Sequence, residues 1–201
     1  MRAIFSLVFD AIFPPSEEAL LVRHADTDEV RALYSPHVIH DVTVLTQYRT
    51  PLMTALVHEA KFHSNKKAID LLGVLLSEHC RETQSQSIHV VPLPLSSARL
   101  RERGYNQVEE VVKRALACGA PLRIHHLLEK VHNTVPQTSL SRTERLTNPQ
   151  GAFAVIDTDI SFDTPLVLID DIMTTGATLD EAARALTRAG FTHIEKLALA
   201  H

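Results

Sequence analysis

The sequence predicts an α/β protein in which a mostly parallel central sheet is flanked by helices. Short apolar runs that read as strands alternate along the chain with amphipathic patterns that read as helices. Such alternation requires crossover connections, which place successive strands parallel. The length of 201 residues suits one α/β domain with at most a small appendage. One apolar run ends at residue 169 in two adjacent acids and a glycine-bearing turn, as ligand sites at strand ends do.

Composition and charge exclude several classes of protein. Hydrophobic residues make up 45% of the chain and charged residues 22%, which is typical of a folded globular protein. The net charge of −4 means that any nucleic-acid contact must come from a local patch. The two cysteines, Cys80 and Cys118, exclude a disulfide scaffold and a cysteine-based zinc site, and they fit a reducing compartment. We therefore expect a cytoplasmic protein.

No apolar run reaches the ~20 residues that a membrane span needs, so no membrane insertion is expected. The apolar opening stretch, residues 1–15, is interrupted by Asp10 and is followed by no small-x-small cleavage site. Its apolar residues share one helical face, so a short packed helix is favoured over an export signal.

The first part of the chain is predicted to be helical. After the opening stretch, residues up to 47 are mostly polar, and their apolar residues form only short repeating patterns, which indicates small helices. Thr50 and Pro51 begin a helix as its N-cap and first residue, and another helix begins near Asn65. We assign residues 1–85 to a helical N-terminal region.

Residues 86–201 are predicted to form the α/β core. Helices are expected at 105–116 and 179–189, and strands at 88–94, from 122, at 151–156, at 165–170 and at 193–201. The connection 132–150 is polar and holds two prolines. It is too long for a compact-domain loop unless it has a task, such as covering a site.

Asp170 and Asp171 follow a buried strand, where ligands of doubly wound sheets bind. The helix that follows points its free N–H groups toward the same crevice, which favours a phosphate dianion. Gly176 permits the tight turn. Carboxylates only accept hydrogen bonds, so they require hydroxyl donors or a hydrated Mg²⁺. Hydroxyls beside a phosphate describe a ribose 5-phosphate, and the hydroxyls of the turn complete its phosphate cup: Thr174, Thr175 and Thr178.

Three alternatives compete for this stretch. Thr178-x-x-Glu181 has the pattern of a capping box, with the two acids as a solvated strand end. A Mg²⁺-holding strand of an NTPase would need a glycine-rich loop that ends in Gly-Lys, and the chain has none. A phosphatase with an Asp-x-Asp motif would need the two acids one residue apart.

The stretch VLIDDIMTTGATL (167–179) resembles the 5-phosphoribosyl-1-pyrophosphate (PRPP) motif of type I phosphoribosyltransferases. The resemblance implies that fold and PRPP with Mg²⁺ as ligand. It also implies that Asp170 and Asp171 hold the ribose hydroxyls and serve catalysis. The turn that would hold the 5-phosphate consists of Thr174, Thr175, Gly176, Ala177 and Thr178.

Three further segments resemble the ComF family, also called the GntX type, of phosphoribosyltransferase-like proteins. They are 56–76 with Lys61-Phe62, 90–116 with a Gly-Tyr-Asn-Gln helix start, and 134–153. The resemblance covers residues 48–201. It departs at the N-terminus, where Phe13-Pro14-Pro15 is followed by no cysteine pair, so the family's zinc ribbon is missing and no metal site is expected.

The resemblance also implies roles for basic residues. The turn after the first core strand would hold pyrophosphate through Leu95, Ser96, Ser97, Ala98 and Arg99. Arg99, Arg101 and Arg103 would neutralise pyrophosphate or bind a nucleic-acid backbone, unless they form a solvated face that Glu102 partly neutralises. Residues 132–150 correspond to the family's flexible loop over PRPP, with Arg142 and Arg145 as its catalytic cations, unless they are an ordinary surface loop.

Two functions stay open. The chain is either a phosphoribosyltransferase of nucleotide metabolism that acts on an unidentified nitrogen acceptor and is linked to competence and DNA uptake, or a non-catalytic module that binds PRPP or single-stranded DNA in natural transformation. A regulator without turnover is a further variant. Residues 1–85 would form the hood that binds the acceptor. The partners considered are PRPP, single-stranded DNA, a competence helicase and a second copy of the chain.

Overall fold

The computed structural model describes residues 15–83, 87–131, 151–156 and 158–201. The predicted loop 132–150, with Arg142 and Arg145, lies outside the described residues, and so does the predicted helix near the N-terminus apart from Pro15.

The described residues form a six-stranded sheet with the order β1-β2-β8-β7-β3-β4. All neighbours pair in parallel except β1 and β2, which pair antiparallel. The predicted α/β class with a mostly parallel central sheet is confirmed. The strands are β1 (His37–Ile39), β2 (Val42–Thr46), β3 (Ile88–Pro92), β4 (Leu122–Ile124), β7 (Leu166–Ile172) and β8 (Ile194–Ala200).

The order of the strands creates a switch point between β3 and β7. From β3 the chain goes to β4 on one side, whereas β7 lies on the other side and leads to β8. β3 and β7 pair in parallel, with Pro92 opposite Ile169, so both end at the same edge of the sheet. Connections that leave in opposite directions open a crevice at that edge, and ligands of doubly wound sheets bind there.

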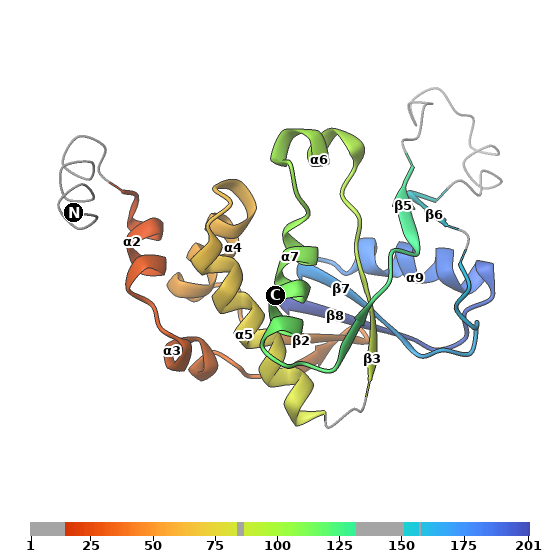
Figure 1. Ribbon diagram of the computed structural model, residues 1–201, viewed down its shortest axis with the longest axis horizontal. Helices are drawn as coiled ribbons and strands as arrows, with labels where there is room; N and C mark the ends of the chain where they lie inside the picture. Colours follow the sequence, from red (N-terminus) through yellow and green to blue (C-terminus); the bar gives the residue numbers. More distant parts are fainter. Residues whose placement is uncertain (1–14, 84–86, 132–150, 157) are drawn as a thin grey trace.

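Helices cover both faces of the sheet, as Figure 1 shows. One face packs against α5 (Lys66–Glu82) and α7 (Gln107–Ala117), and the other against α9 (Ala177–Ala189). The helices α2 (Glu17–His24), α3 (Thr27–Ala32) and α4 (Pro51–Phe62) add to the first layer and share its core. The result is a three-layer arrangement with one hydrophobic core on each face of the sheet.

The predicted helix starts are confirmed. The Thr50 hydroxyl caps α4 by accepting from Met53 N–H at 3.3 Å, and Pro51 is the first helical residue. Asn65 caps α5 in the same way. Local cap chemistry therefore sets both boundaries.

Other elements differ from the expectation. The N-terminal region contributes β1 and β2 as well as helices, and β2 extends the sheet beyond β8. β5 (Leu128–Lys130) and β6 (Phe153–Val155) form a separate antiparallel ribbon and take no part in the central sheet. Strands of three to five residues are too short to show a period in the sequence, which explains why β1 and β2 were missed.

Candidate functional site

The two acids lie near the end of β7. The strand was predicted to end at Asp170, but it continues for two more residues to Ile172, so both acids belong to the strand. Adjacent residues of a strand point to opposite faces of the sheet. Asp171 points toward the α7 side, where it is only 6% exposed. Asp170 lines a small hollow on the α9 side together with residues 172–179. The acid pair is therefore divided between two environments.

Asp171 is held by the protein itself. Its Oδ2 accepts from the Gln107 amide at 2.8 Å and lies 3.4 Å from the ammonium of Lys61 at the end of α4. Its Oδ1 accepts from the N–H of Ile172 at 2.8 Å. A nearly buried carboxylate thus has donors on both oxygens, so its position is fixed before any ligand arrives.

Asp170 has fewer partners. Its Oδ1 accepts from Asp171 N–H at 2.9 Å. Burial raises the pKa of Asp170 to about 7, and the charge of Asp171 adds to the increase, while Lys61 acts weakly in the opposite direction. A carboxyl group with such a pKa can lose its proton near neutral pH, and the carboxylate can then bind a cation or accept hydrogen bonds from hydroxyl groups.

The predicted phosphate turn connects β7 to α9. Gly176 has φ +78° and is the N-cap of α9, with no side-chain cap bond. An added Cβ would meet no atom closer than 3.6 Å, so the left-handed backbone and not lack of space requires glycine here. Four residues of the turn are exposed, and their polar groups face solvent: Thr174, Thr175, Ala177 and Thr178.

The predicted alternative of a capping box at the start of α9 is wrong. Thr178 lies inside the helix, because the helix begins at Ala177. The carboxylate of Glu181 accepts from Ala152 N–H at 2.6 Å, so it joins α9 to the segment before β6. The turn therefore has no capping box, and one long side-chain bond lies within it: Ala177 N–H donates to Thr175 Oγ1 at 3.4 Å.

The predicted pyrophosphate turn lies at the end of β3, next to the acids. Leu93 N–H donates to Ile169 C=O at 3.0 Å, which joins the two strand ends. Leu95 lies just before α6 (Ser97–Arg103), and Ser96 is the N-cap of this helix. Ser97, Ala98 and Arg99 belong to its first helical turn, where a turn between strand and helix was expected. Sequence analysis missed this helix because it has no buried residue and therefore no apolar stripe.

The Gly-Tyr-Asn-Gln segment joins three elements at the crevice. Gly104 ends α6 with φ +78°. The Tyr105 hydroxyl donates to Ala60 C=O on α4, and the Asn106 amide donates to Leu93 C=O at 2.9 Å. Gln107 then reaches Asp171. The motif therefore fixes α4, β3 and β7 relative to one another.

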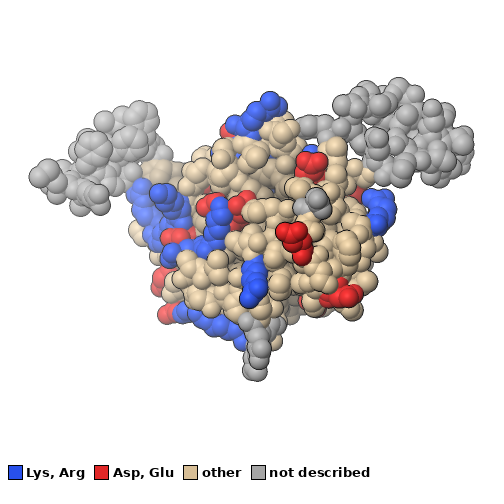
Figure 2. Space-filling model, turned by 45° about the vertical axis from the view of Figure 1, so that its right-hand side comes forward, with Lys and Arg blue, Asp and Glu red and all other residues tan. Residues whose placement is uncertain are grey.

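Only one of the three predicted arginines reaches this network. The guanidinium of Arg103 donates to Gln107 Oε1 at 3.0 Å and lies 5.2 Å from the ring centroid of Phe62, which is 58% exposed. Arg99 and Arg101 are exposed on α6. In Figure 2 basic side chains stand at the upper tip of the described part of the molecule, where Figure 1 shows α6.

Lys61 and Gln107 are site residues that sequence analysis missed. Lys61 was noted only as part of a Lys-aromatic pair, and Gln107 only as part of a helix start. Their common partner, Asp171, is far away in the sequence. No local pattern could have joined them.

The described helices include none that is both long enough and apolar enough to cross a membrane. The crevice is thus a site on a three-layer α/β body, with acceptor oxygens near the end of β7 and with Lys61 and Arg103 as basic side chains that reach the network around Asp171.

Comparison with curated proteins gives relatives that are named as competence proteins or as DNA utilization proteins. The chain is 30% identical over 112 residues to Competence protein F of Haemophilus influenzae, covering 55% of this chain and 49% of that protein. It is 33% identical over 139 residues to the competence protein ComFC of Streptococcus pneumoniae, covering 69% and 59%. It is 28% identical over 173 residues to the DNA utilization protein YhgH of Escherichia coli K12, covering 82% and 74%.

These relatives confirm the resemblance to ComF proteins that the sequence predicted. The chain spans about half the length of the first competence proteins that it matches. No protein-family model matches the chain.

Solved structures that align with the chain include two phosphoribosyl enzymes. Glutamine PRPP amidotransferase of B. subtilis aligns with a TM-score of 0.46 and 18% identity over 71% of this chain and 30% of that chain. A hypoxanthine phosphoribosyltransferase of Staphylococcus aureus aligns with a TM-score of 0.38 and 18% identity over 65% and 61%.

Proposed function

We propose that this homologue of the competence proteins F and ComFC binds PRPP with Mg²⁺ in the crevice between the ends of β3 and β7. One observation carries the proposal. Two carboxylates end β7 at the switch point of the sheet, and the next residues form a glycine turn that begins a helix. In this proposal the turn 174–178 holds the 5-phosphate, and Asp170 and Asp171 accept from the ribose hydroxyls.

The residues present fit a magnesium ion that arrives with PRPP. Mg²⁺ prefers oxygen ligands and keeps several waters. Asp170 is the better partner, because its hollow faces the turn and its carboxyl titrates near neutral pH. Asp171 is already bound by Lys61 and Gln107, and a direct bond to its Oδ2 would displace them. The ion would supply charge for the pyrophosphate group.

We infer that the protein transfers the phosphoribosyl group to a nitrogen acceptor. Such a displacement depends on positioning, on stabilisation of charge and on exclusion of water. The fixed Asp171 and the basic end of β3 are suited to the first two tasks. The predicted pyrophosphate contacts at Leu95–Arg99 and the predicted hood of residues 1–85 stay predictions.

A second candidate function is binding of single-stranded DNA without turnover. The exposed Phe62 ring with the Arg103 guanidinium 5.2 Å away favours it, because aromatic rings stack with bases and arginine adds a cation–π contact. Arg99 and Arg101 on the same side would contact phosphates. A competence helicase, a homodimer and a cytoplasmic location stay predictions as well.

Calorimetry and a pyrophosphate assay test both proposals together. Titration of PRPP in the presence of Mg²⁺ is expected to show saturable one-site binding. Release of pyrophosphate from PRPP on addition of nitrogen bases would identify transfer. If PRPP binds but no nitrogen base leads to release of pyrophosphate, the protein is a PRPP-binding module. If PRPP does not bind, the central proposal is refuted.

A further inference from the structure

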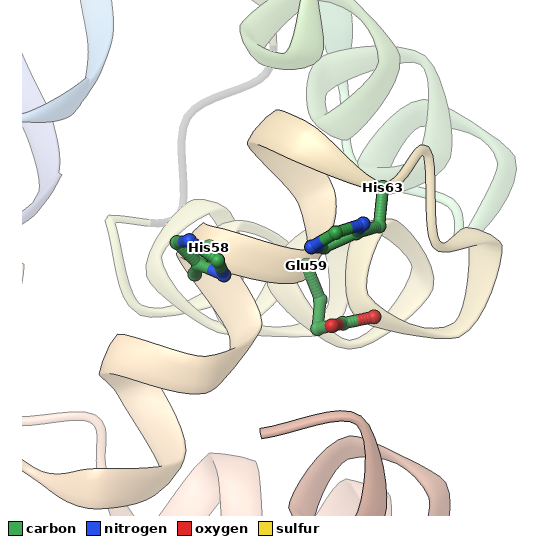
Figure 3. Close-up of side chains that lie close together, drawn as sticks. All are labelled: His58, Glu59 and His63. Atoms are coloured by element: carbon green, nitrogen blue, oxygen red, sulfur yellow. The ribbon is translucent and has the colours of Figure 1, made fainter. Parts of the chain in front are cut away.

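The end of α4 brings together three side chains with nitrogen and oxygen donors. His58 and Glu59 lie in the second half of α4, and His63 is its C-cap. Each offers one ligand atom, and these atoms all lie within 4.8 Å of one another. Figure 3 shows the ring of His63 directed toward His58, with the carboxylate of Glu59 below it in that view. This group was not predicted from the sequence, from which no metal site was expected.

Burial makes Glu59 an uncommon carboxylate. It is only 4% exposed, and its Oε2 accepts from the Asn65 amide at 2.8 Å. Within the described part of the chain, no Lys, Arg or His lies within ion-pair distance of its carboxylate. A buried carboxylate usually needs a cation or several donors, and one neutral amide supplies only part of that. A cation near Glu59 would complete its environment.

His58 is also incompletely satisfied. Its Nδ1 is a buried atom with no hydrogen bond of acceptable geometry to a described residue. The same atom lies 2.7 Å from Oε2 of Glu18 on α2. The two groups are therefore close enough to form an ion pair when His58 is protonated, although the contact does not have the geometry of a hydrogen bond. Glu18 thus adds negative charge beside the three donors, as carboxylates next to metal-binding histidines do.

From these observations we propose that His58, Glu59 and His63 bind a divalent transition-metal ion such as Zn²⁺ or Co²⁺. Two imidazoles and one carboxylate form a donor set that zinc uses with a fourth position left for water. Imidazole ligands select such ions over Mg²⁺. The site is distinct from the PRPP crevice, although Lys61 and Phe62 lie in the same helix end between its ligands.

The geometry also predicts how tightly the ion binds. Ligand atoms on one tetrahedral ion bound at about 2.0–2.2 Å lie roughly 3.4 Å apart, so the three side chains must close by on the order of 1 Å. His63 is exposed at a helix end and can rotate, whereas Asn65 holds Glu59 in place. Because the three ligand side chains must move before they can bind the ion, we expect the bound ion to exchange with ions in solution. We expect no metal to remain through purification and micromolar binding when the ion is added.

Titration with Co²⁺, followed by its visible absorption, tests the site in protein prepared without a histidine tag. One equivalent should bind, with the intense band of a four- or five-coordinate ion, and Zn²⁺ should displace it. His58→Ala with His63→Ala should weaken binding by about tenfold or more, since even outer contacts of metal ligands contribute about 10–100-fold. A matched control, His126→Ala with His193→Ala, removes two exposed histidines elsewhere and should bind as the wild type does.

Glu59→Gln separates a metal site from a structural contact. The amide keeps the shape of the side chain and can still meet Asn65, so without metal the melting temperature should not fall. The rise in melting temperature that Zn²⁺ gives to the wild type should shrink in this variant. The proposal is overturned if wild-type protein shows no Co²⁺ band, if the control variant loses as much affinity as the His58/His63 variant, or if Glu59→Gln responds to Zn²⁺ as the wild type does.

Discussion

The ends of β3 and β7 lie side by side, yet they offer a ligand opposite kinds of contact. The end of β7 has a partly buried acid, a nearly buried acid and a turn without Lys or Arg. The end of β3 has exposed arginines on a short helix. Contacts of the first kind depend on fixed geometry and are screened little by salt, whereas contacts of the second kind are mainly ionic and weaken as salt rises. One crevice can therefore combine contacts that select a ligand by its shape, at the end of β7, with ionic contacts that accept different ligands, at the end of β3.

The largest expected effect comes from removing both charges at the end of β7. Asp170→Asn with Asp171→Asn should weaken PRPP binding with Mg²⁺ by about a hundredfold or more, since each hydrogen bond to a charged group contributes about 1.5–3 kcal/mol. Calorimetric titration measures it. Arg101→Ala serves as the control, with an expected loss below about tenfold. Equal affinities in wild type and double variant would remove the acids from the binding site.

The pH dependence should identify Asp170 in particular. Its pKa in the fold is raised from 3.8 to about 7, so its stabilising contribution is complete below the unfolded value and is lost as pH rises toward about 7. The free energy of unfolding should fall over that range by up to about 4 kcal/mol relative to Asp170→Asn. Urea titrations at a series of pH values measure this difference, and parallel pH curves for the two proteins would contradict it.

Ligand binding should show the opposite trend. Hydroxyls and Mg²⁺ prefer the ionised carboxylate, so PRPP affinity should increase as pH rises from about 6 to about 8. The increase should be smaller in Asp170→Asn, which cannot ionise. A steep increase that persists in the variant would assign the titration to another group, such as the ligand phosphate.

The link between the two strand ends can be tested at Gln107. Gln107→Ala removes the amide that joins Asp171 to Arg103, and it should reduce the free energy of unfolding by about 1–3 kcal/mol, because a nearly buried acceptor loses its donor. Gln107→Glu should be worse, since it puts a second carboxylate beside Asp171. If both variants unfold as the wild type does, the two halves are not coupled through this residue.

The smaller effect at the end of β3 is a change in salt dependence. If single-stranded DNA binds there, Arg101→Ala with Arg103→Ala should reduce the slope of log affinity against log salt by about one or two. Fluorescence anisotropy of a labelled oligonucleotide at several salt concentrations measures the slope. Phe62→Ala should weaken binding while leaving the slope unchanged, because stacking releases no counterions. No binding at low salt would exclude direct contact with DNA.

The smallest expected effect concerns the start of α9. Thr178→Ala should change the free energy of unfolding by less than about 0.5 kcal/mol, because Thr178 caps nothing. Thr50→Ala, at a true N-cap, should cost about 1 kcal/mol. Equal losses in urea titrations would mean that the turn is closed by a cap after all.

Sequence patterns predicted the half of the crevice that is local in the chain. The acids, the glycine turn and the start of the following helix lie within thirteen residues, 167–179, so one motif contains them. The N-cap at Thr50 and the helix start near Asn65 were predicted for the same reason. Gln107 and Asp171 are 64 positions apart, and only the parallel pairing of β3 with β7 brings them together. The His58, Glu59 and His63 group depends on the turn after α4, whose backbone no pattern specifies.

The position of β2 has a consequence for how the chain is made. β2 pairs in parallel with β8, Val42 lying opposite Lys196, so a ribosome must add about 150 further residues before the partner strand exists. Until then β2 presents an unpaired edge, which is a site for pairing with other chains. The helices of the N-terminal region can pack early, but the sheet becomes complete only when its latest strand slides between β2 and β7. β8 thus completes the sheet, and we expect nascent chains that do not yet include β8 to be the most prone to aggregation.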